Sequence, residues 1–323
     1  MSRILVTGGA GFIGSHLAER LLTDGHDVVV LDNFSTGKLE NLVGVKDSVH
    51  VIKGDLRDPD IVAEAVVGCE VVFHKGALPS VPRSIEQPGD SHDANATGTL
   101  NVLNAARAAG VRRVVYASSS SAYGDTPESV KVETLPTWPL SPYGVAKLTG
   151  EHYCRVFSHV YGFETVSLRY FNVFGPRQDE TSQYAAVIPQ FISRRLSGIP
   201  PRIYGDGTQT RDFTFVENVV DANLAAGWSS EATGEVINIA CGQRTSLLDL
   251  VGQLDEVLGE TVEPIFEPAR AGDIKHSLAD IGKARRCLGY DPKVSLHDGL
   301  KRTVAWFESR NGETSKSVTG CSP

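Results

Sequence analysis

Two residues one helical turn apart carry side chains that can together act as an acid–base pair. Tyr143 and Lys147 are separated by Gly-Val-Ala, which places both side chains on the same face of a helix. The pKa of a free tyrosine is about 10, too high for a base at neutral pH, but a neighbouring ammonium group favours the phenolate and lowers that pKa. The same pattern arises by chance on surface helices, so the rest of the sequence must decide between these interpretations.

A run of serines supplies hydroxyl groups that suit the same chemistry. Residues 117–124 read ASSSSAYG and follow an apolar stretch with the character of a β-strand. The carboxyl ends of parallel strands border the crevice in which ligands bind. Ser119, Ser120 or Ser121 could there share a proton with the substrate hydroxyl that Tyr143 deprotonates. Serines are common in loops, so the run alone does not single out one residue.

A glycine-rich segment near the N-terminus predicts a dinucleotide site. Gly8, Gly11 and Gly14 have GxxGxxG spacing, and Phe12 and Ile13 stand between the last two. Such a loop needs a tight turn and close approach of the backbone to a pyrophosphate, which then meets the N–H groups at a helix N-terminus. Glycines in ordinary turns are the alternative. The apolar run before the loop and the amphipathic pattern after it favour the dinucleotide site.

Polar residues after the next strands fit the same dinucleotide. Asp32 lies 18 residues after Gly14, where a carboxylate would accept hydrogen bonds from ribose hydroxyls and repel a 2′-phosphate, so NAD is favoured over NADP. Asn33 is assigned to the same site, and Asp55, beside Leu56, would reach the adenine amine. Asn95 lies near the loop after the fourth strand. Ordinary capping of helices or turns is the alternative for Asp55 and Asn95.

The elements that would position these residues form a doubly wound parallel sheet, or Rossmann fold. Apolar runs rich in Val and Ile alternate with helical patterns, as in repeated β-α-β units. One helix is expected from Phe12 to Gly25, one over about Asp90–Gly110, and one after Ser141-Pro142, which has the form of a helix start. The expected strands are Arg3–Thr7, Asp27–Leu31, Val49–Lys53, Glu70–His74, Arg113–Ala117 and Thr165–Arg169.

The second half of the chain predicts a smaller C-terminal α/β lobe that contacts substrate. Residues 1–171 are assigned to the NAD-binding domain, with the chain crossing back to it at about 205–230, and residues 172–310 mainly to the substrate lobe. Short strands of this lobe are expected at Val236–Ala240 and Glu263–Phe266. The polar residues 311–323 are expected to form a tail.

The composition is ordinary for a soluble globular protein. The 323 residues carry a formal net charge of −8 without a basic cluster, which argues against nucleic-acid and anionic-membrane partners. No apolar stretch has the length of a membrane span. The five scattered cysteines form no CxxC pair or Cys/His cluster, so no metal site is expected and a cytoplasmic location is favoured.

These motifs together resemble the extended short-chain dehydrogenase/reductase family, and in particular the UDP-hexose 4-epimerases. The resemblance covers Arg3 to about Phe307 and is greatest to the UDP-N-acetylglucosamine 4-epimerase branch. It implies inversion of C4 of a UDP-hexose through a 4-keto intermediate, with NAD held tightly. The segments that carry it, besides the motifs above, are Ser80–Ile85, Arg169–Gln178, Tyr184–Pro189, Arg211–Phe213 and Arg270–Asp273.

The resemblance also implies roles for individual residues. Ser119 would be the catalytic hydroxyl and Tyr143 the base, while Lys147 would lower the pKa of that base and hold the nicotinamide ribose. Arg211 and Arg270 would clamp the substrate diphosphate; without the resemblance they are an arginine paired with its neighbour Asp212 and a loop arginine. The remaining implied substrate residues are Ser80, Arg83, Ser120, Ser121, Asn172, Ala186, Val187, Tyr204 and Asp273.

One position is expected to select the sugar. Relatives restricted to glucose and galactose forms carry a large aromatic residue where this chain has Ser277. A small serine leaves room for an N-acetyl group, which predicts activity on UDP-GlcNAc and UDP-GalNAc and also on UDP-Glc and UDP-Gal. An ordinary strand residue without contact to substrate is the alternative for Ser277.

Three alternatives remain at this stage. A 4,6-dehydratase would need an acidic pair where this chain has Ser120 and Ser121. A UDP-glucuronate epimerase or decarboxylase would need a carboxylate-binding group, for which Arg83 is a candidate. A non-catalytic NAD-binding protein would not need Tyr143 and Lys147.

Two further features are implied by comparison with the family. A homodimer would form through helices over about Asp90–Gly110 and Pro142–Tyr161. Lys75 departs from the small apolar residues usual after the fourth strand, and either helps to bind the pyrophosphate or points into solvent.

Overall fold

A seven-stranded parallel sheet forms the centre of the molecule. The computed structural model describes residues 1–180, 186–269 and 275–318, with only the backbone for 311–318. The strand order β11-β6-β5-β4-β1-β2-β3 is that of a doubly wound sheet and confirms the Rossmann fold. All six strands predicted for the first half are present: β1 (Arg3–Thr7), β2 (Asp27–Asp32), β3 (Val49–Lys53), β4 (Val71–His74), β5 (Arg113–Ser119) and β6 (Glu164–Tyr170).

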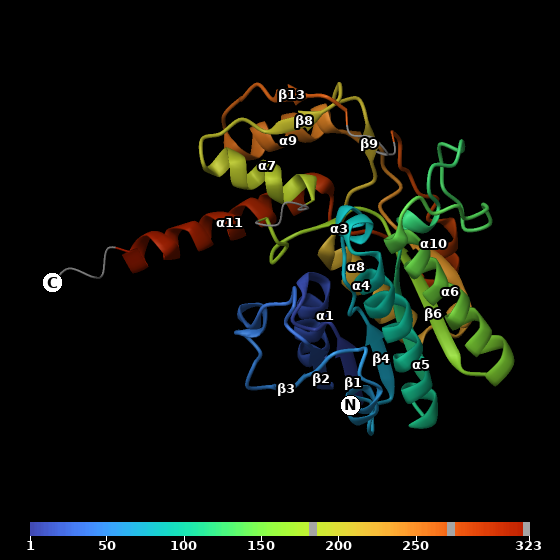
Figure 1. Cartoon of the computed structure of the whole chain (residues 1–323). Helices are drawn as coiled ribbons and strands as arrows, with labels where there is room; N and C mark the ends of the chain where they lie inside the picture. The colour runs from blue at the N-terminus through green and yellow to red at the C-terminus, as the bar shows by residue number, and fades with distance from the viewer. Residues whose placement is uncertain (181–185, 270–274, 319–323) are drawn as a thin grey trace.

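Helices cover both faces of this sheet, which is why its central strands are apolar at successive positions. Strand residues on one face of the sheet pack against α1 and α8 and form one core. Strand residues on the other face pack against α2, α5 and α6 and form a second core. The two layers are visible on either side of the sheet in Figure 1. The covering helices are α1 (Phe12–Thr23), α2 (Pro59–Ala65), α5 (Gly98–Ala108), α6 (Pro142–Tyr161) and α8 (Val216–Trp228).

The helix predicted over about Asp90–Gly110 is interrupted. A short helix, α4 (Pro88–His92), leads into a π-helical turn, η2 (Asp93–Thr97), which continues as α5. Such turns insert one residue into a helix and often accompany functional sites. A separate short helix, α3 (Val81–Glu86), precedes them.

The strand predicted at Val236–Ala240 belongs to the main sheet and not to the smaller lobe. As β11 (Val236–Ile239), it pairs in parallel with β6 at the sheet edge. Ile237 and Ile239 are fully buried there. Helix α8 packs beside α1, and α10 (Gly282–Leu288) packs against β11. The chain therefore returns to the sheet over more residues than the predicted 205–230.

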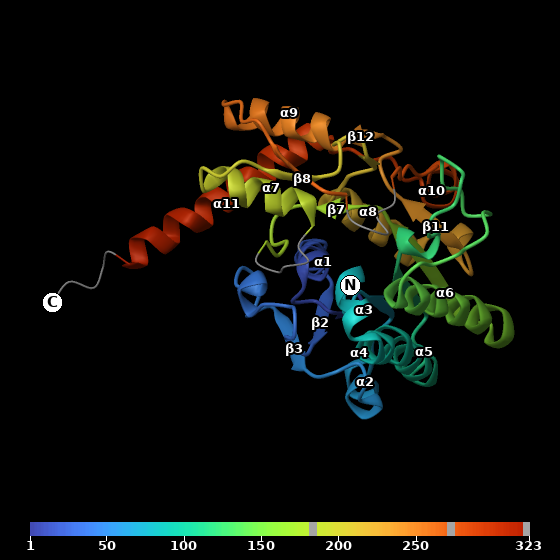
Figure 2. The same cartoon turned by 45° about the horizontal axis from the view of Figure 1, so that its top comes forward.

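The smaller lobe lies above the carboxyl ends of the strands (Figures 1 and 2). It has its own apolar core between α7, α9 and α11. Its helices are α7 (Val187–Leu196), α9 (Leu247–Leu258) and α11 (Leu296–Val318), and its short strands are β7 (Val173–Phe174), β8 (Arg202–Tyr204), β9 (Thr210–Arg211), β10 (Thr214–Phe215), β12 (Thr245–Ser246) and β13 (Ile265–Glu267).

Two segments of this lobe differ from the sequence expectation. The last short strand, β13, begins two residues later than the predicted Glu263–Phe266 and pairs with β8. Helix α11 continues to Val318, past residue 310, where a polar tail is predicted. Its final turns project away from the lobe (Figure 1).

Candidate active site

The glycine-rich loop between β1 and α1 is closely packed against backbone. Gly8 has a φ of 65°, a left-handed conformation that favours glycine. A Cβ on Gly14 would lie 2.1 Å from the carbonyl oxygen of Gly8. Gly11 is the N-cap of α1 and has no side chain to accept hydrogen bonds from the first N–H groups of the helix. The first turn of α1 lines a cavity, and its N–H groups are available to a ligand there. This arrangement fits the pyrophosphate of a dinucleotide.

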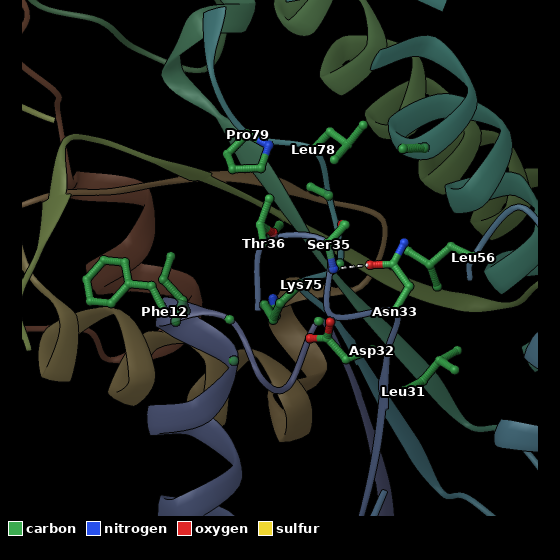
Figure 3. A pocket seen from close by; sticks show the side chains of 18 of the residues that line it. Phe12, Leu31, Asp32, Asn33, Ser35, Thr36, Leu56, Lys75, Leu78 and Pro79 are labelled. Carbon is green, nitrogen blue, oxygen red and sulfur yellow. Dashed lines mark hydrogen bonds between the residues drawn. The ribbon is translucent and has the colours of Figure 1, made fainter. Parts of the chain in front are cut away.

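Two carboxylates, Asp32 at the end of β2 and Asp55 shortly after β3, line the same cavity; Figure 3 shows Asp32 beside Asn33. Asp32 accepts hydrogen bonds from the backbone N–H groups of Ala10, at 2.9 Å, and Phe34, at 2.8 Å. Burial nevertheless raises the pKa of Asp32. Asp55 is bonded by Asn33 at 2.8 Å and by Arg57 at 2.8 Å, and these bonds hold its pKa well below the ordinary value. Both carboxylates therefore stabilise their loops as well as bordering the cavity.

The structure brings nearly all predicted cofactor residues to this one cavity. The exception is Asn95, which is buried and hydrogen-bonds both the N–H and the carbonyl group of Leu78. Its side chain fixes the loop after β4, as the capping alternative implies. The predicted residues that line the cavity are Gly8, Gly11, Phe12, Ile13, Gly14, Asp32, Asn33, Asp55, Leu56, Tyr143 and Lys147.

Helix α6 places Tyr143 and Lys147 in the wall of the same cavity. Ser141 caps the helix as predicted, accepting a hydrogen bond from the N–H of Gly144 at 3.1 Å, and Pro142 occupies the first turn. The Lys147 ammonium donates to the carbonyl of Ala117 at 2.8 Å and lies 5.8 Å from the centre of the Tyr143 ring.

The protein residues alone do not lower the pKa of Tyr143, and a lowering by Lys147 together with the positive nicotinamide ring of bound NAD stays a prediction. Burial raises the pKa of Tyr143, and a hydrogen bond with Ser119 only partly offsets this. Burial also lowers the pKa of Lys147 to about 7. A buried phenolate and a buried ammonium are each costly because both lose hydration. Further positive charge in the cavity is therefore needed to favour the phenolate.

Among the three candidate serines, the hydrogen bonds distinguish Ser119. Its hydroxyl lowers the pKa of Tyr143, accepts a hydrogen bond from the N–H of Ser121 at 3.1 Å and donates one to the Ser121 hydroxyl at 3.1 Å. The turn that orients it is η3 (Ser120–Ala122), for which Ser119 is the N-cap. Ser120 and Ser121 lie in this turn, beside the hydroxyl that contacts the phenol.

One polar cluster behind the site was missed in the sequence. Glu151 on α6 is buried and accepts two hydrogen bonds from Arg169, at 2.8 and 2.7 Å, and one from Ser118. It ties α6 to β5 and β6 at the level of the reacting residues. Its spacing was the available signal, because Glu151 follows Tyr143 and Lys147 at successive intervals of four residues on the same helix face.

Lys75 does not point into solvent, which excludes one of its two sequence interpretations. Its side chain lines the cavity and lies amid the residues drawn in Figure 3. The ammonium donates to the carbonyl of Val115 at 3.2 Å and to the hydroxyl of Tyr170 at 2.9 Å. It therefore lies near Lys147 and not in open solvent, and its partners are groups of β5 and β6.

A second cavity lies where the smaller lobe meets the sheet. Tyr170 lines the first cavity and Asn172, two residues further on, lines the second. The buried Asp212 accepts from the backbone N–H groups of Cys241, Gly242 and Ala279. Its neighbour Arg211 lines the second cavity. The predicted substrate residues gathered there are Asn172, Ala186, Val187, Tyr204 and Arg211.

The other predicted substrate residues have different locations. Arg270 and Asp273 lie outside the described residues. Ser277 donates its N–H to the carbonyl of Thr210 at 3.1 Å, next to Arg211. Ser80 caps α3 through a hydrogen bond from the N–H of Arg83, at 3.2 Å, and both residues border a separate small pocket.

The described residues contain neither a metal-binding cluster nor a helix suited to cross a membrane. No three His, Cys, Asp or Glu side chains gather there in a way that could hold a metal ion. None of the helices in that part of the chain combines the length and apolar character needed to cross a membrane.

The fold and the first cavity are those of a dinucleotide-binding protein, with Tyr143 and Lys147 in that cavity and most of the predicted substrate residues of the smaller lobe in the second. The profile of the NAD dependent epimerase/dehydratase family matches residues 4–240, and the chain belongs to that family.

Named relatives align over nearly their whole length. The UDP-glucose 4-epimerase of Mycolicibacterium smegmatis is 40% identical over 313 residues, which cover 96% of this chain and 99% of the relative. The UDP-N-acetylglucosamine 4-epimerase of Methanobrevibacter ruminantium, solved with UDP-N-acetylmuramic acid, has a TM-score of 0.92 at 40% identity over 96% of this chain and 99% of that chain. The UDP-glucose 4-epimerase of Thermotoga maritima, solved with UDP-glucose, has a TM-score of 0.91 at 39% identity over the same shares.

Proposed function

We propose that this protein is an NAD-dependent 4-epimerase of UDP-hexoses. The observation that carries the proposal is that the two cavities are lined by residues only two positions apart at the end of β6. Tyr143, Lys147 and the glycine-rich loop line one cavity, and the chain passes from Tyr170 in that cavity to Asn172 in the next. The similarity to UDP-glucose and UDP-N-acetylglucosamine 4-epimerases supports it.

The residues of the chain account for the proton chemistry. Bound NAD would supply a hydride acceptor and donor for C4 of the sugar. Tyr143 would take the proton of the 4-hydroxyl and return it after the 4-keto sugar has presented its other face. Ser119 lies close enough to the phenol to favour its ionised form, and the Lys147 ammonium stabilises the phenolate when it forms.

The reaction can be tested without added cofactor. The purified chain is incubated separately with UDP-GlcNAc and with UDP-Glc, and the products are followed by proton NMR. Formation of the C4 epimers would establish both the reaction and the tightly held NAD. Loss of carbon dioxide from UDP-glucuronate or a 4-keto-6-deoxy product instead would assign the chain to another reaction of the family. No turnover of any UDP-sugar would indicate a binding protein.

Ser277 is proposed to admit the N-acetyl group of the sugar. It is partly buried, and its N–H bonds the carbonyl of Thr210, the residue before Arg211, which lines the second cavity. Replacing Ser277 by tyrosine should reduce the rate with UDP-GlcNAc roughly tenfold or more relative to UDP-Glc, because the ring would fill the space of the 2-substituent. The measurement is kcat/KM for both substrates. Ser277→Ala is the matched control and should keep both rates, whereas an equal loss on both substrates in Ser277→Tyr would contradict the assignment.

The partner is proposed to be a second copy of the chain, docked through α5 and α6. These helices contact each other on one face of the sheet. Val145, Val156 and Val160 on α6 are exposed and fall on one side of the helix at spacings of eleven and four residues. An exposed apolar stripe of this kind is typical of an interface.

The dimer proposal predicts a monomeric variant. Replacing Val156 and Val160 together by glutamate should raise the dimer dissociation constant by roughly a hundredfold or more, because charges would be buried without partners. Sedimentation equilibrium measures the mass. Val67→Glu, at an equally exposed valine away from α6, should leave the dimer intact. A wild-type chain that sediments as a monomer would overturn the proposal.

A further inference from the structure

The ammonium groups of two lysines donate hydrogen bonds to carbonyl groups on the same edge of β5. The Lys147 ammonium donates to the carbonyl of Ala117 at 2.8 Å, and the Lys75 ammonium donates to the carbonyl of Val115 at 3.2 Å. Carbonyls two residues apart on a strand point the same way and are about 7 Å apart. The two ammonium groups, one from α6 and one from the loop after β4, are therefore close neighbours at one end of the cavity.

No opposite charge among the described residues around the pair is free to neutralise it. The carboxylate of Glu151 accepts two hydrogen bonds from Arg169 and is already paired. Burial keeps the remaining titratable groups around the lysines uncharged, because it raises the pKa of each phenol and thiol and lowers that of the imidazole. These groups are Tyr116, Tyr143, Cys154, Tyr170 and His74.

The pair carries more positive charge than Lys147 would alone. Burial, strengthened by the charge of Lys147, lowers the pKa of Lys75 well below its ordinary value, and burial lowers the pKa of Lys147 to about 7. Two neighbouring lysines each make protonation of the other less favourable. Two coupled sites always bind at least as many protons as one of them alone. Removing Lys75 must therefore lower the positive charge at this end of the cavity at any pH.

We propose that Lys75 sets the oxidation state of the cofactor that the protein prefers, by disfavouring the cationic nicotinamide ring of NAD⁺ relative to the uncharged ring of NADH. The inference rests on the proposed function, and on the reacting end of the cavity being the end with Tyr143 and Lys147. Adding one hydride to NAD⁺ changes the ring charge from +1 to 0 and leaves the pyrophosphate unchanged. The two forms therefore differ in charge only at the ring, where the lysine pair lies.

The consequence for the reaction is an easier first oxidation. A site that holds NADH better than NAD⁺ makes transfer of hydride from C4 of the sugar more favourable, since the electrons move toward the preferred form. The departure from a small apolar residue at position 75 thus has a physical effect on the balance between hydroxyl and keto sugar. Lys75 acts through its charge and takes no part in the proton transfer that Tyr143 carries out.

The test measures the ratio of NAD⁺ to NADH that the full-length chain binds when both are offered together. The protein is equilibrated with equal excess concentrations of NAD⁺ and NADH, separated from free nucleotide, and denatured, and the released forms are quantified by chromatography. In Lys75→Met the bound ratio of NAD⁺ to NADH should rise severalfold, to about tenfold over wild type, because the variant removes positive charge from the end of the cavity that the ring would occupy. Lys75→Gln should shift the ratio in the same direction.

Lys131 provides the matched control. It is a buried lysine whose ammonium donates to the carbonyls of Thr126, at 2.9 Å, and Glu128, at 2.7 Å. Lys131→Met should leave the partition unchanged. An unchanged partition in Lys75→Met, or an equal shift in Lys131→Met, would overturn the inference alone. A wild-type chain that binds neither form would overturn the proposed function first, so the two failures can be told apart.

Discussion

Replacing Tyr143 by phenylalanine is expected to reduce kcat for epimerisation by roughly a thousandfold or more. The change removes one oxygen, the atom that takes the proton of the sugar hydroxyl. Lys147 cannot take over, because its ammonium is held on the carbonyl of Ala117 at 2.8 Å. Ser119 cannot either, since the hydroxyl of a serine ionises far less readily than that of a tyrosine. The measurement is single-turnover and steady-state kinetics with UDP-GlcNAc and UDP-Glc.

The loss must be separated from a structural effect. Tyr143→Phe keeps the ring and removes only the hydroxyl of a residue that lines the cavity and is not among the buried core residues. Bound NAD and the midpoint of thermal unfolding should therefore stay close to wild type. Tyr161→Phe, at an exposed position at the end of the same helix, is the matched control and should keep full activity. Activity of Tyr143→Phe within tenfold of wild type would exclude Tyr143 as the base.

The sequence was a sufficient guide to the parts of this protein that depend on local patterns. The strands of the first half are short apolar runs, and the residues after them fall at one sheet edge once the strands are parallel. The capping of α6 by Ser141 also follows from residue type and position alone. These features require no knowledge of which distant elements pack together.

Errors arose where long-range packing decides. The run at Val236–Ala240 has the same apolar character as a strand of a small lobe, and only its pairing with β6 shows that it extends the main sheet. Asn95 has the position of a ligand, yet its amide is taken up by Leu78. The direction of the Lys75 side chain depends on Val115 and Tyr170, which come from two other strands.

The same distinction applies to the pKa of Tyr143. Spacing on a helix predicts that the ammonium of Lys147 is near the phenol, and it is. Spacing does not report how much water the fold removes from both groups, and this desolvation raises the pKa of Tyr143. A sequence pattern thus identifies the pair, while the surrounding burial sets its charge.

The second large effect is expected from Gly14→Ala, which should abolish retention of NAD. A Cβ at this position would lie 2.1 Å from the carbonyl oxygen of Gly8 and 2.8 Å from the Cα of Gly9. All of these contacts are with backbone, so no side chain can turn away to make room. The start of α1 would have to move from β1, and with it the N–H groups that face the pyrophosphate.

Gly14→Ala should therefore lose bound NAD and about 1–3 kcal/mol of stability, as expected for overpacking against a rigid neighbour. The measurements are the NAD content of the purified chain and its unfolding in denaturant. Gly252→Ala is the matched control: Gly252 is exposed within α9, and a Cβ there meets nothing within 4 Å. That variant should retain NAD and gain up to about 1 kcal/mol, because alanine is the better helix former. Stoichiometric NAD in Gly14→Ala would show that the close approach of α1 to β1 is not what holds the cofactor.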